Sequence, residues 1–103
     1  MIVAIVSFKL TQPKTLEEMK QVFQSTAPKY LSLPGLLRKN YFLTEDGLRA
    51  GGIYVWESKE RAQRFYSPEW QNFVAGKYGA PPEILYVDSP VMVDNIAGAI
   101  TVD

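Results

Sequence analysis

The residues best suited to chemistry lie in one short segment of the chain, between Leu36 and Glu57. Among its cationic, amide and aromatic side chains are Arg38, Lys39, Asn40, Tyr41, Tyr54 and Trp56. A cation lowers the pKa of a bound phenol or enol, and tyrosine or asparagine donates hydrogen bonds to the oxyanion that forms. Aromatic walls supply shape and exclude water. These residue types therefore predict chemistry on an ionisable aromatic compound.

The composition removes several common catalytic groups. The chain has no cysteine and no histidine. This excludes thiolate nucleophiles, sulfur metal sites, the usual general base and an ordinary proximal haem ligand. Lysine plus arginine equals aspartate plus glutamate at eleven each, so we expect neither nucleic acid nor a membrane as a partner. No pair of carboxylates has a spacing that demands acid–base chemistry, and we expect no metal site.

The length of 103 residues allows one domain, spanning 1–103. An apolar content of 47% favours a folded, soluble protein. Residues 2–8 are apolar, but the run is too short to span a bilayer and no basic region precedes it. We therefore expect a cytoplasmic protein.

The segment from Leu36 to Glu57 is predicted to form two strands joined at Asp46-Gly47, the strongest short-range hairpin signal. Both strands carry apolar residues at odd and even positions, so each side of the hairpin has something to bury. A chain of this length has few helices with which to cover two faces. We expect the second face to meet another subunit, in a homodimer.

The length of this turn decides which side chains share a face. A turn of two or four residues places Tyr54 opposite Lys39 and puts Arg38 and Asn40 on the face of Ile53. A three-residue turn with a glycine bulge instead brings Arg38 to the side of Tyr54. We favour the bulged turn, because an arginine between two sheets is costly unless it is paired.

Capping patterns predict the helices. Thr15 and Glu18 form a capping-box pattern, and the helix that follows should end or kink near Thr26 because of Pro28, leaving a short turn to residue 31. Ser58 caps a helix through residue 66. Ser67-Pro68 begins another, with proline at the first helical position.

The remaining apolar segments are predicted to be strands. Residues 2–8 read as a central strand buried on both faces, and residues 83–87 as a further strand that 91–95 continues. Residues 96–103 form an apolar arm that should dock on this subunit or its partner. The order β-α-β-β-α-β predicts an α+β, ferredoxin-like fold with an antiparallel sheet and the helices on one face.

Three segments carry a resemblance to a known family. The runs at 33–39, 51–58 and 67–70 resemble those of the dimeric α/β-barrel proteins, and within them the small mono-oxygenases related to antibiotic-biosynthesis mono-oxygenases. The resemblance implies a homodimer whose two sheets pack face to face, with a pocket between sheet and helices in each protomer. It also implies oxidation of phenolic or polyketide-like compounds by O₂ with no metal, flavin or other cofactor.

The resemblance does not extend to haem degradation. That branch uses an asparagine on the first strand, a tryptophan at the end of the third and a histidine on the second long helix. Trp56 fits the tryptophan, but Ser7 stands near the asparagine position and histidine is absent. In the quinone-forming branch, Trp56, Tyr54 and Arg38 supply counterparts, again without histidine.

We therefore predict a cofactor-independent mono-oxygenase acting on a small aromatic, phenolic or quinol-like compound. Arg38 would stabilise the anion, Tyr54 and Asn40 would orient the substrate, and Trp56 would act as a wall or electron-transfer neighbour. Further pocket residues are expected to be Tyr41, Lys39, Trp70, Phe65, Phe23 and Tyr30. Two alternatives use the same pocket: a non-enzymatic small-molecule-binding dimer, and an isomerase or cyclase that needs no oxygen.

Overall fold

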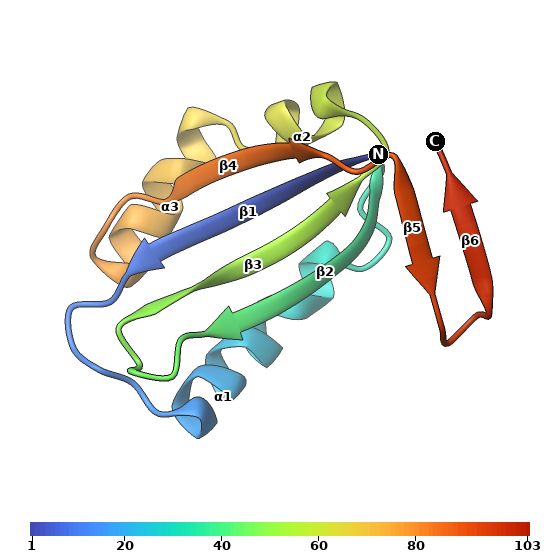
Figure 1. Cartoon of the computed structure of the whole chain (residues 1–103). Helices are drawn as coiled ribbons and strands as arrows, with labels where there is room; N and C mark the ends of the chain where they lie inside the picture. The colour runs from blue at the N-terminus through green and yellow to red at the C-terminus, as the bar shows by residue number, and fades with distance from the viewer.

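The computed structural model describes residues 1–103, which form one four-stranded sheet, its helices and a separate hairpin (Figure 1). The elements in chain order are β1 (Ile2–Lys9), α1 (Leu16–Thr26), the 3₁₀ turn η1 (Ala27–Tyr30), β2 (Leu36–Leu43), β3 (Arg49–Trp56), α2 (Lys59–Phe65), α3 (Pro68–Tyr78), β4 (Glu83–Asp88), β5 (Val91–Asp94) and β6 (Ala99–Val102). The main sheet has the order β2-β3-β1-β4 with every neighbouring pair antiparallel. The predicted α+β, ferredoxin-like arrangement is confirmed.

The helix boundaries follow the predicted capping. Thr15 accepts a hydrogen bond from the backbone N–H of Glu18, whose carboxylate accepts one in return from the N–H of Thr15. The chain then tightens into η1, with Pro28 in its first turn. Ser67 caps the N-terminus of α3, and Gly79, with a positive φ of 85°, caps its C-terminus after Tyr78.

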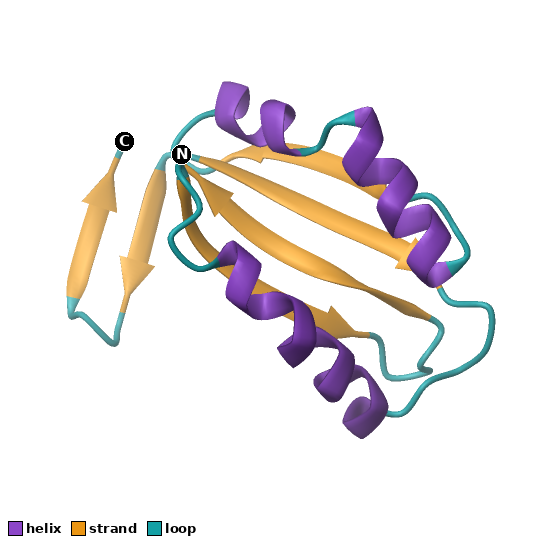
Figure 2. Cartoon of the chain, turned by 180° about the vertical axis from the view of Figure 1, so that it is seen from behind, coloured by secondary structure: helices purple, strands orange, loops and turns teal.

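All helices lie on one face of the sheet (Figure 2). In that view α1 runs along one side and α3 along the other, so the middle strands lie between them. The core forms where alternate residues of β1 and β3 face these helices, and it includes Ala4, Val6, Tyr54 and Trp56. These side chains are buried because their strands are central in the sheet.

The turn between β2 and β3 differs from the favoured prediction. Leu43 pairs with Ala50, and the Asp46 carboxylate accepts a hydrogen bond from the N–H of Leu48, which fixes a four-residue turn after Thr44. The three-residue bulged turn was therefore the wrong choice. A bulge does occur, but at the opposite end of the hairpin, where Leu37 is skipped in the pairing.

The register places Arg38 and Asn40 on the outer face of the sheet, away from the helices. Lys39 is opposite Tyr54, whereas Arg38 is opposite Val55 and Asn40 is opposite Ile53. Arg38 can occupy this face because it has a partner there: its guanidinium lies 3.3 Å from the carboxylate of Asp94.

The chain leaves the main sheet after β4. Instead of continuing that strand, β5 pairs with β6 in a hairpin that projects from the body beside the N-terminus (Figure 1). The prediction that residues 91–95 extend the preceding strand was therefore wrong. Side chains of this hairpin remain largely exposed, including Ile96 at 98%.

The outer face of the sheet is apolar and partly exposed. Ile53, Leu85 and Val87 are 42%, 58% and 38% exposed, and β1 contributes Val3 and Ile5 between them. The predicted burial of β1 on both faces thus holds within the protomer only for the face toward the helices. No helix is both long and apolar enough to cross a membrane.

Candidate functional site

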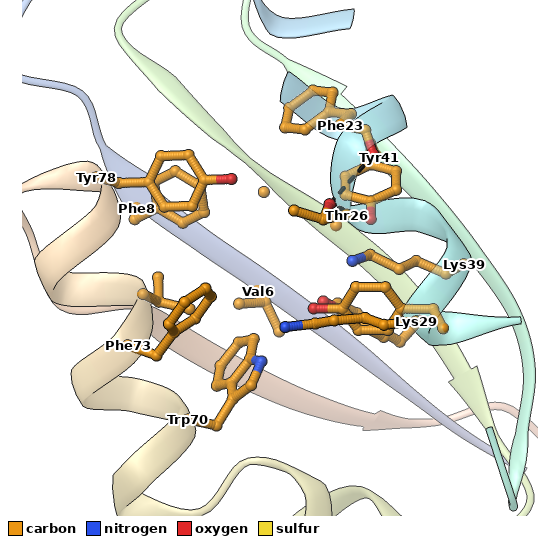
Figure 3. A pocket seen from close by; sticks show the side chains of 15 residues that line it. Val6, Phe8, Phe23, Thr26, Lys29, Lys39, Tyr41, Trp70, Phe73 and Tyr78 are labelled. Carbon is orange, nitrogen blue, oxygen red and sulfur yellow. Dashed lines mark hydrogen bonds between the residues drawn. The ribbon is translucent and has the colours of Figure 1, made fainter. Parts of the chain in front are cut away.

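A pocket lies between the helix-facing side of the sheet and the helices α1 and α3 (Figure 3). Of the predicted residues, Phe23, Tyr30, Lys39, Tyr41, Tyr54 and Trp70 line it. Its cavity has a volume of about 30 Å³, which is room for one or two water molecules. An aromatic ligand therefore needs side chains at the mouth to move aside.

Lys39 extends from β2 into this pocket and lies among three tyrosine rings. Its ammonium nitrogen is 3.3 Å from the ring centroid of Tyr30, 3.8 Å from that of Tyr41 and 4.6 Å from that of Tyr54. Such contacts hold a cation over the ring faces. The side chain makes no ion pair.

The surroundings of Lys39 shift its titration to neutral pH. Burial, and then the positive charge of Lys29, lower the pKa of Lys39 from 10.5 to about 7. Both the ammonium and the neutral amine are therefore populated near neutral pH. A lysine in this range is able to exchange a proton with a bound phenol or enol.

Gly52 leaves room for the Lys39 side chain. It pairs with Tyr41 across the hairpin, and a Cβ at this position would lie 3.0 Å from Cε of Lys39 and 2.9 Å from the Tyr54 ring. The glycine thus lets the lysine cross the floor of the pocket, which explains one of the two adjacent glycines in β3.

The pocket tyrosines are hydrogen-bond donors at neutral pH. Burial raises the pKa of Tyr54 far above its usual value, and it also raises the pKa of Tyr41 although a hydrogen bond with Thr26 acts in the opposite direction. Burial, with smaller contributions from Tyr30 and Tyr41, raises the pKa of Tyr78 to about 12. The 2.8 Å bond between Tyr41 and Thr26 also ties β2 to the end of α1.

Trp70 contributes a hydrogen-bond donor that no protein group satisfies. Its indole N–H is buried, has no partner and belongs to a side chain that lines the pocket. A buried donor without an acceptor costs roughly 1–3 kcal/mol. An oxygen atom of a ligand in the pocket would supply the missing acceptor.

Four predicted residues lie outside the pocket. Trp56 is only 1% exposed and donates a 3.0 Å hydrogen bond from its indole N–H to the hydroxyl of Tyr66. Phe65 packs against the same indole with ring centroids 5.6 Å apart. Both lie in the core next to the pocket, whereas Arg38 and Asn40 occupy the opposite face of the sheet.

Sequence reasoning missed several lining residues. These are Val6, Phe8, Thr26, Lys29, Gly51, Gly52, Phe73, Val74 and Tyr78. Most are apolar residues whose pattern predicts core packing and nothing more. No sequence signal singled out Lys29, which is an exposed lysine on η1. No group of three or more carboxylates is close enough to hold a metal ion.

Residues 3–77 match the family described as "Putative mono-oxygenase ydhR", which accounts for more than half of the chain. This protein belongs to the ydhR family. The predicted kinship with small mono-oxygenases is therefore confirmed. A comparison with curated protein sequences finds no significant match.

Solved structures with the same fold as this ydhR family member include bacterial oxygenases. The mono-oxygenase ActVA-Orf6 of Streptomyces coelicolor, in complex with nanaomycin D, superposes with a TM-score of 0.63 at 19% identity over 85% of this chain and 86% of its own. SnoaB, a cofactor-independent oxygenase of Streptomyces nogalater, superposes with a TM-score of 0.59 at 17% identity, over 85% of this chain and 91% of its own. An ethyl tert-butyl ether D family protein of Bacillus halodurans superposes with a TM-score of 0.54 at 16% identity, over 86% of this chain and 99% of its own. At these identities the similarity establishes the shared fold.

Proposed function

We propose that this protein is a cofactor-independent mono-oxygenase of small phenolic or quinol-like aromatic compounds, with Lys39 as its proton acceptor. The observation that carries the proposal is a lysine with a pKa near 7 at the floor of an aromatic pocket that contains no carboxylate. Membership of the ydhR family and the fold shared with SnoaB support the same reaction class.

The first step is removal of a substrate proton. The neutral amine of Lys39 takes the proton from a phenol, enol or activated C–H, and the resulting ammonium stays beside the substrate anion. The rings of Tyr30, Tyr41 and Tyr54 surround this ammonium, so the ion pair forms where water is largely excluded. Tyr54 is proposed to donate a hydrogen bond to the anionic oxygen.

The second step is oxidation by O₂. The electron-rich anion gives one electron to O₂, and the substrate radical and superoxide combine to form a C–O bond. The peroxide then takes up the proton held by Lys39. Where the new C–O bond lies on a carbon that was a CH₂ group, the hydroperoxide loses water and this carbon becomes a carbonyl. One oxygen atom therefore enters the product and the other leaves as water. The protein's part is to form and protect the anion.

Oxygen consumption by the purified protein tests this function. A panel of quinols, anthrones and small phenols should show protein-dependent uptake of O₂, and ¹⁸O₂ should label the product at one oxygen atom. A reaction without protein controls for autoxidation. Binding without turnover in air would contradict the proposal in favour of a binding protein. Turnover without oxygen would favour an isomerase or cyclase that uses the same base.

We predict that kcat/KM rises with pH through about 7, because the neutral form of Lys39 is the active one. The titratable groups that face Lys39 are Tyr30, Tyr41, Tyr54 and Lys29. Replacement of Lys29 by methionine removes a neighbouring positive charge, so the midpoint should move to higher pH. Two substrates of different pKa separate the enzyme's titration from that of the substrate. A midpoint that follows the substrate alone would contradict the assignment.

We also propose that the outer face of the sheet binds a second copy of this chain. Exposed Ile53, Leu85 and Val87 form an apolar surface that a monomer would leave in water. Light scattering at micromolar concentration should give the mass of a dimer, and Ile53→Asp should shift it toward a monomer. Glu60→Gln, on the exposed side of α2, is the control. A monomeric wild-type protein would contradict this proposal.

A further inference from the structure

The pocket carries a second free cation at its mouth. Lys29 lies on η1 and reaches across toward α3, where its ammonium nitrogen is 4.6 Å from the ring centroid of Phe73 (Figure 3). Like Lys39, it takes part in no ion pair. The pocket lining thus includes two lysines and neither aspartate nor glutamate.

An unsatisfied donor belongs to the same pocket. Figure 3 shows the indole nitrogen of Trp70 and the ammonium of Lys29 both directed into the space between α3 and η1. Since the Trp70 N–H is buried without an acceptor, this side of the pocket offers a cation and a hydrogen-bond donor with nothing to bind. A carboxylate supplies both the negative charge and the acceptor oxygens.

The backbone that carries Lys29 is anchored by hydrogen bonds. Thr26, directly before η1, bonds to Tyr41 on β2, which ties the start of η1 to the sheet, and the N–H of Leu31 donates to the carbonyl of Pro28, which closes the turn. The lysine therefore projects from an anchored turn. Its side chain and Phe73 are both exposed, which allows them to move as a ligand enters.

We propose that the pocket binds aromatic hydroxy acids, with the carboxylate held at the mouth by Lys29 and Trp70 and the hydroxyl directed to Lys39. This inference rests on the proposed function and narrows its substrate class. Rings on both sides of the pocket, including Phe23, Tyr41, Trp70, Phe73 and Tyr78, provide flat apolar surfaces for the planar body of such a compound.

Binding under anaerobic conditions tests the carboxylate without turnover. The probes are 4-hydroxybenzoate and 6-hydroxy-2-naphthoate, each compared with its methyl ester by isothermal titration calorimetry. Wild-type protein should bind at least one acid about tenfold more tightly than its ester, since a charge-assisted hydrogen bond is worth roughly 1.5–3 kcal/mol. Lys29→Met should abolish this preference and leave the affinity for the ester nearly unchanged.

Lys77→Met is the matched control. Lys77 is also exposed and its ammonium lies 5.9 Å from the Phe73 ring centroid, but it does not line the pocket. Its replacement should change neither affinity. Equal binding of acid and ester, an acid preference that survives in Lys29→Met, or no binding of any probe would each overturn the proposal.

Oxygen uptake with the panel of quinols, anthrones and small phenols separates this proposal from the proposed function. Selective binding of the acid, with no protein-dependent oxygen uptake from any compound of the panel, would retain the ligand class and remove the mono-oxygenase. Oxygenation of panel compounds, together with equal binding of each acid and its ester, would retain the mono-oxygenase and remove the carboxylate site.

Discussion

Lys39→Met is expected to lower kcat/KM by at least about 100-fold, the usual contribution of a positioned general base. Methionine has a similar length and keeps the apolar contacts with the rings of Tyr30 and Tyr41, but it cannot accept a proton. Steady-state oxygen uptake at pH 8 measures the loss. Residual activity close to that of wild type would show that Lys39 is not the proton acceptor.

The same substitution is expected to stabilise the fold. Folding lowers the pKa of Lys39 from 10.5 to about 7, so the unfolded chain binds more protons between these pH values. Wild-type stability therefore rises with pH across this window, and the advantage of Lys39→Met should be largest below pH 7 and fade toward pH 10.5. Thermal melts of both proteins from pH 6 to 10 measure it. A variant that loses both activity and stability would indicate a structural role for the lysine.

Two control variants separate charge from proton transfer. Lys39→Arg keeps a positive charge but cannot act as a base at neutral pH, so it should remain inactive if proton abstraction matters. Arg38→Met removes the neighbouring cation on the outer face, which pairs with Asp94, and should leave kcat/KM nearly unchanged. A large loss of activity in Arg38→Met would instead restore that residue to the site.

Trp56→Ala is expected to destabilise the protein by about 3–5 kcal/mol, a typical cost of removing a large buried aromatic side chain. Trp56 is 1% exposed and packs against Tyr54, Phe65 and Tyr66. For a domain of this size such a loss is a large part of its total stability. Urea unfolding followed by circular dichroism measures the change. A loss below about 1 kcal/mol would contradict the core assignment.

Trp56→Phe distinguishes a structural role from a catalytic one. It keeps an aromatic ring but leaves the Tyr66 hydroxyl without its donor, which should cost about 1–3 kcal/mol of stability. Because Trp56 does not line the pocket, kcat/KM of the folded variant should stay within about threefold of wild type. A tenfold or greater loss at a temperature where the variant is folded would support the electron-transfer role that the sequence suggested.

Local signals determined much of the fold from the sequence. The Thr15–Glu18 capping box, the Ser67-Pro68 helix start and the break near Pro28 each act within a few residues, so their outcome depends little on distant parts of the chain. The hairpin and the overall β-α-β-β-α-β order follow from similar short-range patterns. The sequence also determined the chemical inventory: aromatic rings, lysine and arginine, without histidine or cysteine.

Only the tertiary structure decided which of these groups form the site. Arg38 and Lys39 are consecutive in β2 and so point to opposite faces in any register. The hairpin register decides that Lys39 shares the face of Tyr54, and this register depends on hydrogen bonds within a four-residue turn that the Asp-Gly signal alone does not specify. Lys39 differs from the other lysines because the ring centroid of Tyr30, from η1, lies 3.3 Å from its ammonium and the charge of Lys29 acts on it. These interactions join β2 to a turn that lies outside the hairpin. The shift in its pKa comes from burial and a neighbouring charge. Both depend on packing between elements, which residue spacing does not encode.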